Sequence, residues 1–116
     1  MNFNAGPNVG DLNRRIVLRR ATQSRDGFNS PVLTFSNLTT VWAKADPVSD
    51  GERMRAGQEY STLAMRFQIR WSSVVANLDT KDQLIHDGRT YNIVGVKEIE
   101  RHRWLEITAA TAGERA

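Results

Sequence analysis

Few residues of this 116-residue chain stand in a pattern that indicates catalysis. His86 and His102 could act as general bases or metal ligands. Each lies at a predicted hairpin or polar connection, where a solvent-exposed histidine without a chemical role is the commoner case, and their spacing matches no zinc motif. Asp79, Asp82 and Asp87 could be imagined around calcium, but they lack the ligand spacing of a calcium loop. We interpret them as carboxylates of strand ends and turns.

Other common catalytic signatures are also missing from the sequence. Gly51 and Gly57 are too far apart to cradle a phosphate, and no lysine follows them. Serines fall mainly in predicted turns, and none lies in a nucleophile elbow. The chain has no cysteine, which excludes disulfides and thiolate metal sites and fits a reducing cytosol. We therefore predict a protein that is not an enzyme and that uses no cofactor or metal.

The three tryptophans are large apolar side chains for a core or a binding surface. Trp71 ends an alternating segment, which predicts core packing for its ring. The alternative is stacking on bases, as in barrels that bind single strands. That surface would need aromatic side chains on the solvent-facing side of the strand. The solvent-facing side of the segment that ends at Trp71 is polar instead. We predict that it is an exposed basic strand face made of Arg66, Gln68 and Arg70.

These side chains must be positioned by strands, because the apolar pattern repeats every two residues. The clearest case is 63–71, in which apolar and polar side chains alternate. An Asp-Gly pair predicts a turn within 21–31, and another predicts a hairpin at 87–88. The segment 72–78 fits a short turn or a helical fragment. Strands are expected at 12–20, 40–45, 63–71, 82–85, 90–99 and 104–109, while 32–38 fits a short strand or a loop.

This arrangement predicts an all-β fold, a small closed or partly open β-barrel of about six antiparallel strands. Closure is expected because it removes exposed sheet edges. The length suits a single domain over residues 1–116. We expect a flexible N-terminal arm at 1–10 and a frayed tail at 110–116. We expect neither a signal peptide nor a segment that spans a bilayer.

The net charge of the chain is +3, and 13 of its 16 basic residues are arginine. A solvated basic surface is one interpretation. Contact with nucleic acid or with an acidic partner is the other, and the arginine bias favours it because guanidinium groups suit interfaces. The basic residues are spread along the chain, so they predict no dedicated nucleic-acid patch.

A polar stretch from Asp46 to Thr62 neither alternates like a strand nor fits a tight turn. A connection of roughly 17 residues is long for a compact domain, where about 4–6 residues are usual. Loops that are kept at this length commonly have a function. We predict a long projecting loop at 46–62, and a merely flexible, solvated loop is the other interpretation.

Several short segments follow one another along the chain in a distinctive order. They are Gly10-Asp-Leu-Asn-Arg-Arg-Ile-Val-Leu18, Asp26-Gly-Phe28, Val41-Trp-Ala-Lys-Ala-Asp-Pro47, Gly51-Glu52, Met65-Arg-Phe-Gln-Ile-Arg-Trp71, Leu84-Ile-His-Asp-Gly-Arg-Thr-Tyr-Asn-Ile-Val94 and Trp104-Leu-Glu-Ile107. In this order they resemble the phage head–tail joining proteins of long-tailed bacteriophages and prophages. These are also called head-closure, stopper or head–tail adaptor proteins. The resemblance covers most of the chain, from Gly10 to Thr108.

The resemblance implies a small barrel that assembles as a homo-oligomeric ring beneath the portal and its adaptor and bridges the DNA-filled head to the tail. The implied partners are copies of itself, the portal or adaptor protein, the tail tube or tail completion protein, and packaged double-stranded DNA, with no membrane. In related proteins the long loop projects toward the channel and helps to retain DNA. The implied location is the virion, at the head–tail interface, after synthesis in the bacterial host cytoplasm.

A ring uses head-to-tail contacts, and mixed charges on the loop suit pairing between neighbouring loops. The candidate channel or subunit-interface residues are Asp50, Glu52, Arg53, Arg55, Gln58, Glu59 and Tyr60. The N-terminal arm is a further candidate for contact with a neighbouring subunit. The alternative function is a small β-barrel that binds single-stranded nucleic acid.

Overall fold

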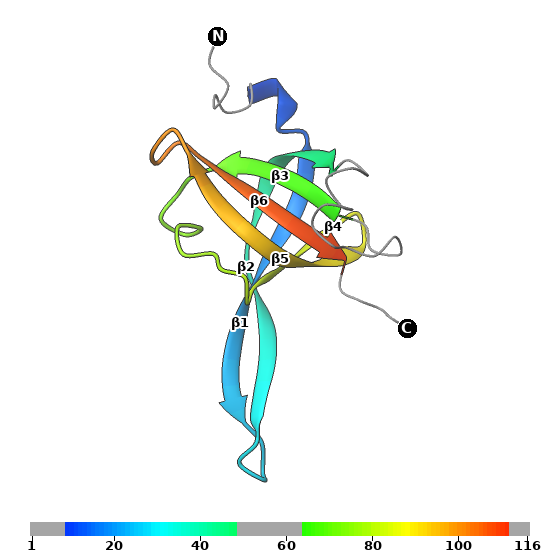
Figure 1. Cartoon of the computed structure of the whole chain (residues 1–116), viewed down its shortest axis with the longest axis vertical. Coiled ribbons are helices and arrows are strands. Elements are labelled where there is room, and N and C mark those ends of the chain that lie inside the picture. The colour runs from blue at the N-terminus through cyan, green and yellow to red at the C-terminus, as the bar shows by residue number, and fades with distance from the viewer. Residues whose placement is uncertain (1–8, 49–63, 112–116) are drawn as a thin grey trace.

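Six antiparallel strands close into a barrel in the order β1-β2-β3-β6-β5-β4 (Figure 1). This computed structural model describes residues 9–48 and 64–111. A short 3₁₀ turn at Val9–Asp11 precedes the strands. The strands are β1 Arg14–Arg25, β2 Pro31–Pro47, β3 Ala64–Arg70, β4 Gln83–His86, β5 Arg89–Ile99 and β6 Trp104–Thr111. The predicted all-β barrel of antiparallel strands is confirmed.

The barrel interior is filled by the apolar side chains that alternate along each strand. Phe67 and Ile69 of β3 are fully buried, and Met65 and Trp71 pack against the core from partly buried positions. The predicted phase of this strand is therefore correct for these four residues. Removing such side chains from water is the main stabilising contribution to a small domain. The remaining core residues are Ile16, Leu18, Ala43, Val75, Leu78, Leu84, Tyr91, Ile93, Leu105, Ile107 and Ala109.

Two irregularities in the strand register bend the sheet so that it can close. In the β1–β2 ladder the pairing shifts after Leu18, and Leu38 is the extra residue on β2. In the β5–β6 ladder the pairing shifts after Ile93, and Val94 is the extra residue on β5. Leu38 still packs against the core, whereas Val94 is exposed.

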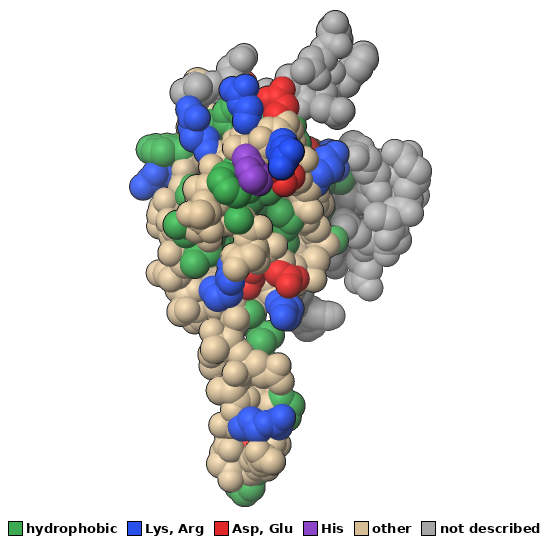
Figure 2. Space-filling model, turned by 90° about the vertical axis from the view of Figure 1, so that its left-hand side faces the viewer, with side chains coloured by type: hydrophobic (Ala, Val, Ile, Leu, Met, Phe, Trp, Pro, Cys, Tyr) green, Lys and Arg blue, Asp and Glu red, His purple; other side chains and the backbone are tan. Residues whose placement is uncertain are grey.

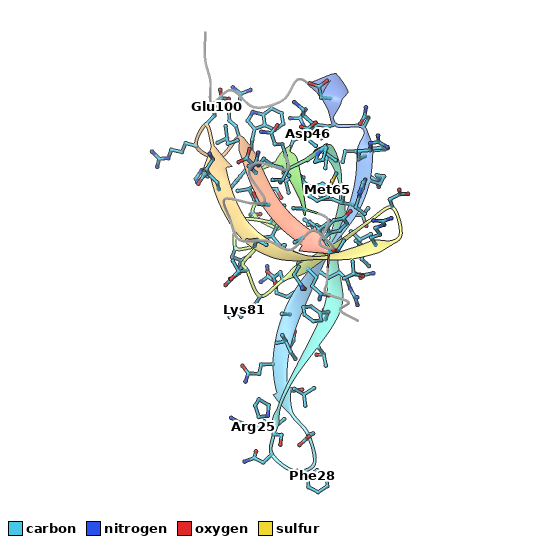
Figure 3. The ribbon with its side chains drawn as sticks, turned by 45° about the vertical axis from the view of Figure 1, so that its right-hand side comes forward. Arg25, Phe28, Asp46, Met65, Lys81 and Glu100 are labelled. Carbon is cyan, nitrogen blue, oxygen red and sulfur yellow. The ribbon has the colours of Figure 1, made fainter. Side chains whose placement is uncertain are left out.

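Beyond the first irregularity, β1 and β2 leave the barrel as a two-stranded hairpin (Figures 1 and 3). β1 pairs with β4 only over 16–19, and β2 pairs with β3 only over 43–47. The turn predicted within 21–31 is confirmed at 26–30, but β1 continues to Arg25 rather than ending at 20. The segment 32–38 is part of β2 and not a loop. Neither face of the projecting hairpin is buried, so its strands lack the apolar alternation that would reveal them.

The predicted hairpin between β4 and β5 is confirmed, and it turns at Asp87-Gly88. Asp87 has a φ of 54° and Gly88 a φ of 79°. Two consecutive residues with positive φ are what a two-residue turn needs to match the twist of its strands. The segment 72–78 contains turns and no helix.

The ends of three elements differ from expectation. β2 runs through Pro47 rather than stopping before it, and the N–H of Val48 donates to the carbonyl of Ala64 at 3.0 Å. Proline is tolerated here because it is the last residue of its strand. β6 reaches Thr111, two residues into the expected tail, and a 3₁₀ turn occupies the end of the expected arm. Within the described ranges, no helix is long and apolar enough to cross a bilayer.

Candidate interaction surface

The loop residues singled out from the sequence lie outside the described part of the chain. They are Asp50, Glu52, Arg53, Arg55, Gln58, Glu59 and Tyr60. The two ends of the segment that carries them are adjacent in space, since Val48 is hydrogen-bonded to Ala64. Their roles remain predictions.

The polar face of β3 contains Arg66, Gln68 and Arg70, and only Arg70 is exposed. Arg66 and Gln68 are half-buried because Glu106 of the neighbouring strand β6 lies against both. The Nε of Arg66 is 4.0 Å from Glu106 Oε1, and Gln68 Nε2 donates to Glu106 Oε2 at 3.4 Å. Lys97 Nζ of β5 is 3.8 Å from the same carboxylate. The carboxylate of Glu106 thus offsets much of the positive charge on this face of the sheet.

Arg70 belongs to a different feature, a groove at the barrel end where β1 begins. A hollow of about 350 Å³ is lined by Leu12, Asn13, Trp42 and Arg70. A second hollow of about 340 Å³ shares three of these residues and extends along β1, β2 and the end of β3. Its lining is Leu12, Arg15, Thr40, Val41, Trp42, Arg70, Trp71 and Ser72. Because the two hollows share Leu12, Trp42 and Arg70, we treat them as one and call it the barrel-end groove.

The register of three strands brings these side chains together. Arg15 of β1 is paired with Trp42 of β2. Ala43, the next residue of β2, is buried and is paired with Ile69 of β3. Trp42 precedes Ala43 and Arg70 follows Ile69. Because neighbouring residues of a strand point to opposite faces, Trp42 and Arg70 both lie on the outer face. The Trp42 side chain is 51% exposed.

Both arginines of the groove lie over aromatic rings. The guanidinium carbon of Arg15 is 4.5 Å from the ring centroid of Trp42. That of Arg70 is 5.4 Å from the centroid of Trp104, which is almost fully buried. These contacts orient the cations. Neither guanidinium is within ion-pair distance of a carboxylate in the described ranges, so both are available to an acidic group of a partner.

The two histidines occupy different environments. His102 is exposed in the β5–β6 turn, as expected, and its ring stacks on Trp71 at 4.2 Å between centroids. Glu98 accepts a hydrogen bond from the backbone N–H of His102 and lies 3.8 Å from its Nε2. His86 does not fit the interpretation of an exposed loop histidine. It is the last residue of β4, is half-buried, and packs edge-to-face on Phe67 at 5.3 Å.

The environment of His86 disfavours its charged form. Burial lowers the pKa of the His86 imidazole below its usual value, and Arg14 lowers it further, while Asp87 acts in the opposite direction. The Nδ1 atom is buried and has no hydrogen-bond partner. His86 and His102 lie at opposite ends of β5, because β4 leads into its start and the β5–β6 turn follows its end. The two imidazoles therefore do not form a joint acid–base site.

The three aspartates act as structural groups. Asp82 is 3% exposed and accepts hydrogen bonds from the N–H groups of Ala21 and Asp79. Asp79 in turn accepts from the hydroxyl of Thr80 at 3.2 Å. Asp87 lies in the β4–β5 turn. Over 9–48 and 64–111, no group of three or more His, Cys, Asp or Glu residues could hold a metal ion.

A closed barrel whose notable exposed features are an aromatic–arginine groove and a projecting hairpin defines a binding or assembly module. The chain belongs to the phage head completion protein family, whose profile matches residues 7–112. The family is a structural one, and the protein is accordingly a virion-associated component with a structural role at the phage head–tail region. The family resemblance expected from the ordered segments is confirmed.

Two solved structures are similar to this chain over nearly their full lengths. Protein SF1141 from Shigella flexneri 2a, determined in solution, is 25% identical, with a TM-score of 0.70, and the match covers 94% of this chain and 100% of that one. A chain in the virion of a native gene transfer agent particle is also 25% identical, with a TM-score of 0.64. That match covers 87% of this chain and 96% of the other. No curated protein sequence matches the chain.

The barrel-end groove is the part of the site that sequence reasoning missed. A signal for it was present, since Trp42 alternates with the small residues Val41 and Ala43 and shares its phase with Lys44. A tryptophan in phase with a lysine is a candidate for the outer face of a strand. The partners Leu12 and Arg70 come from distant parts of the chain, so the groove itself needs the strand register.

Proposed function

We propose that the protein forms a ring at the head–tail joint, between the portal or adaptor complex and the tail, and closes the filled head. The observation that best supports this function is the family match over residues 7–112. The likeness to a chain of a gene transfer agent virion adds support. A closed barrel also suits a ring, because its wall offers two different surfaces for head-to-tail contacts between copies.

Of the segment predicted at 46–62, Asp46 and Pro47 belong to β2, and the part that follows Val48 is proposed to face the channel of this ring and to help retain packaged double-stranded DNA. The described residues on either side of it, Val48 and Ala64, are hydrogen-bonded to each other, so the segment begins and ends at one place on the barrel wall. The charges at Asp50, Glu52, Arg53 and Arg55 suit contacts between neighbouring copies. The proposed neighbours along the channel axis are the portal or adaptor protein and a tail tube or tail completion protein.

Deletion of residues 49–58 tests the DNA-retention role. We expect the purified variant to keep the far-UV circular dichroism of the parent chain, because the deletion removes no described strand. Particles assembled with it should contain the protein at the joint but lose packaged DNA. Replacement of the same residues by a Gly/Ser linker of equal length separates the effect of sequence from that of length. Full DNA retention in the deletion variant would rule out this role for the segment.

The location of the protein and its role in closing the head are tested separately in particles. Negative-stain microscopy of particles with tagged protein should show the tag at the head–tail joint. Particles that lack the protein should have open, empty heads and unattached tails. If the tag is found elsewhere, or if heads without the protein keep their DNA and their tails, the proposed function is wrong.

Single-stranded nucleic-acid binding is the second candidate function. The half-exposed Trp42 beside Arg15 and Arg70 favours it, because base-binding surfaces combine aromatic rings with cations. Binding of short oligonucleotides should then quench tryptophan fluorescence and weaken steeply with added salt. Absence of quenching at low salt would exclude this candidate.

A further inference from the structure

The tip of the projecting hairpin presents an aromatic side chain to solvent. Phe28 is 91% exposed, and Figure 3 shows it at the far end of the hairpin from the barrel. In Figure 2 a hydrophobic side chain forms the end of this hairpin, and basic side chains lie both over the barrel and on the hairpin just behind its tip. A phenylalanine so placed contributes little to the stability of its own chain. An exposed aromatic side chain on an ordered loop is a candidate interface anchor, because aromatic residues are enriched at the centres of protein interfaces.

The loop that carries Phe28 is held by several hydrogen bonds. Asp26 Oδ1 accepts from the N–H of Phe28 at 2.8 Å and from that of Ser30 at 3.0 Å. The N–H of Asn29 donates to the carbonyl of Asp26 at 3.0 Å, and Arg25 Nη1 donates to the carbonyl of Asn29 at 3.0 Å. Asn29 has a φ of 65°, which asparagine tolerates better than most residues. An anchor on a preformed loop loses little conformational entropy on binding.

The barrel-end groove has the complementary properties. It is lined mainly by apolar surface from Leu12 and the exposed ring of Trp42, and it is large enough for an aromatic side chain. Arg15 and Arg70 edge it without carboxylate partners in the described ranges. At the tip, Asp26 uses Oδ1 for both of its turn hydrogen bonds, so Oδ2 is left for an arginine. The tip therefore offers an aromatic side chain and a carboxylate oxygen, and the groove offers apolar surface and guanidinium groups to receive them.

One molecule cannot make this contact with itself. The tip and Trp42 lie on the same pair of strands, and the stretch of β2 from Pro31 to Trp42 spans roughly 35 Å at about 3.3 Å per residue. The groove of one copy is therefore available to the tip of another. A contact between two different patches is heterologous, and repetition of it gives a ring or an open chain.

We propose that the Phe28 tip of one subunit inserts into the barrel-end groove of the next copy of this chain. The proposal rests on the proposed ring function and gives that ring a specific contact. Phe28 packs against Leu12 and Trp42 of the neighbour, and Asp26 pairs with Arg15 or Arg70. The exposed hairpin is then an arm that links adjacent subunits.

Cysteine crosslinking tests this contact directly, because the chain has no cysteine of its own. The test pair is Gly27→Cys at the tip with Asn13→Cys at the groove, which leaves Phe28 and Trp42 in place. A Cβ added at Gly27 meets no atom within 4 Å. The control pair is Gly27→Cys with Val94→Cys, which is exposed on another part of the wall. Disulfides form only between residues whose Cα atoms come within about 7 Å.

Oxidation is carried out on the concentrated full-length protein and on assembled particles. We expect covalent multimers of the chain with the test pair and monomers with the control pair. Phe28→Ala or Trp42→Ala in the test-pair background should slow crosslinking by about tenfold or more, as for loss of an interface anchor. Circular dichroism checks that these variants remain folded.

The proposal is overturned if the test pair stays monomeric both in solution and in particles that carry the protein at the joint. It is also overturned if the tip cysteine crosslinks only to a different protein. Either result leaves the proposed function intact, because the protein is still found at the joint. Multimers in solution together with a protein absent from the joint would overturn the proposed function and keep the tip–groove contact.

Discussion

Asp82 fixes the root of the projecting hairpin to the barrel, because its Oδ1 accepts a hydrogen bond from the backbone N–H of Ala21 at 2.9 Å. Its Oδ2 accepts from the N–H of Asp79 at 3.0 Å and lies 3.5 Å from Arg20 Nε. Its carbonyl accepts from the N–H of Ile93 at 3.2 Å. One buried residue thus ties β1, the β3–β4 connection and β5 at the point where β1 leaves the barrel.

Asp82→Ala should lower the free energy of unfolding by about 2–4 kcal/mol, because it leaves two N–H groups without their acceptor and removes the ion-pair partner of Arg20. Asp82→Asn keeps one acceptor oxygen and should cost less. Urea unfolding followed by circular dichroism measures both. The control is Asp46→Ala, which within the described ranges removes only an exposed 3.9 Å contact with Lys44 and should cost below about 0.5 kcal/mol. Equal losses for Asp82→Ala and Asp46→Ala would show that the buried carboxylate is not a stabilising tie.

The β4–β5 turn provides a comparison between two glycines. Gly88 has a φ of 79°, so Gly88→Ala forces an L-residue into the left-handed region and should cost about 1 kcal/mol. Gly95→Ala meets no atom within 4 Å and lies in β5 without positive φ, so it should be neutral or slightly stabilising. Thermal unfolding of the two variants measures the difference. A Gly95 variant that loses as much stability as the Gly88 variant would contradict this assignment.

His86 should make the fold sensitive to acid. Burial lowers the pKa of folded His86 below the value of about 6.5 expected in the unfolded chain. The unfolded chain therefore binds more protons between those two values, and stability should fall as the pH drops below about 6.5. The decrease levels off once the pH is below the folded pKa.

The measurement is the free energy of unfolding from pH 8 to pH 5 for the parent chain, His86→Leu and His102→Gln. His86→Leu should lose part of the pH dependence, and His102→Gln should retain it. These are the two histidines of the chain, so the pair isolates the half-buried one. The same pH slope in the parent chain and His86→Leu would assign the effect to other groups.

Sequence patterns predicted the elements in which one face is buried and the turns that need positive φ. Phe67 and Ile69 alternate with polar residues, and Asp87-Gly88 is a strong turn signal, so the strand and the turn could both be predicted. The turn of the projecting hairpin was predicted but the extent of its two strands was not, because a strand that is exposed on both faces carries no periodic apolar pattern. The barrel-end groove depends on the register of three strands, which local patterns do not set. The role of Asp82 depends on Ala21, which lies far from it in the sequence.

A comparison of substitutions at Trp42 and Trp104 tests whether the barrel-end groove serves binding or folding. Trp104 is 5% exposed, so Trp104→Ala should destabilise the fold by about 3–5 kcal/mol through the cavity it leaves. Trp42 is half-exposed, and Trp42→Ala loses mainly the Arg15 contact, worth about 1 kcal/mol or less. Urea unfolding gives the two stabilities, and head–tail joining in assembled particles gives the functional readout. We expect Trp42→Ala to fold with near-parent stability and still impair joining. If Trp42→Ala destabilises the chain as much as Trp104→Ala, the groove is a structural element and its exposed ring needs no partner.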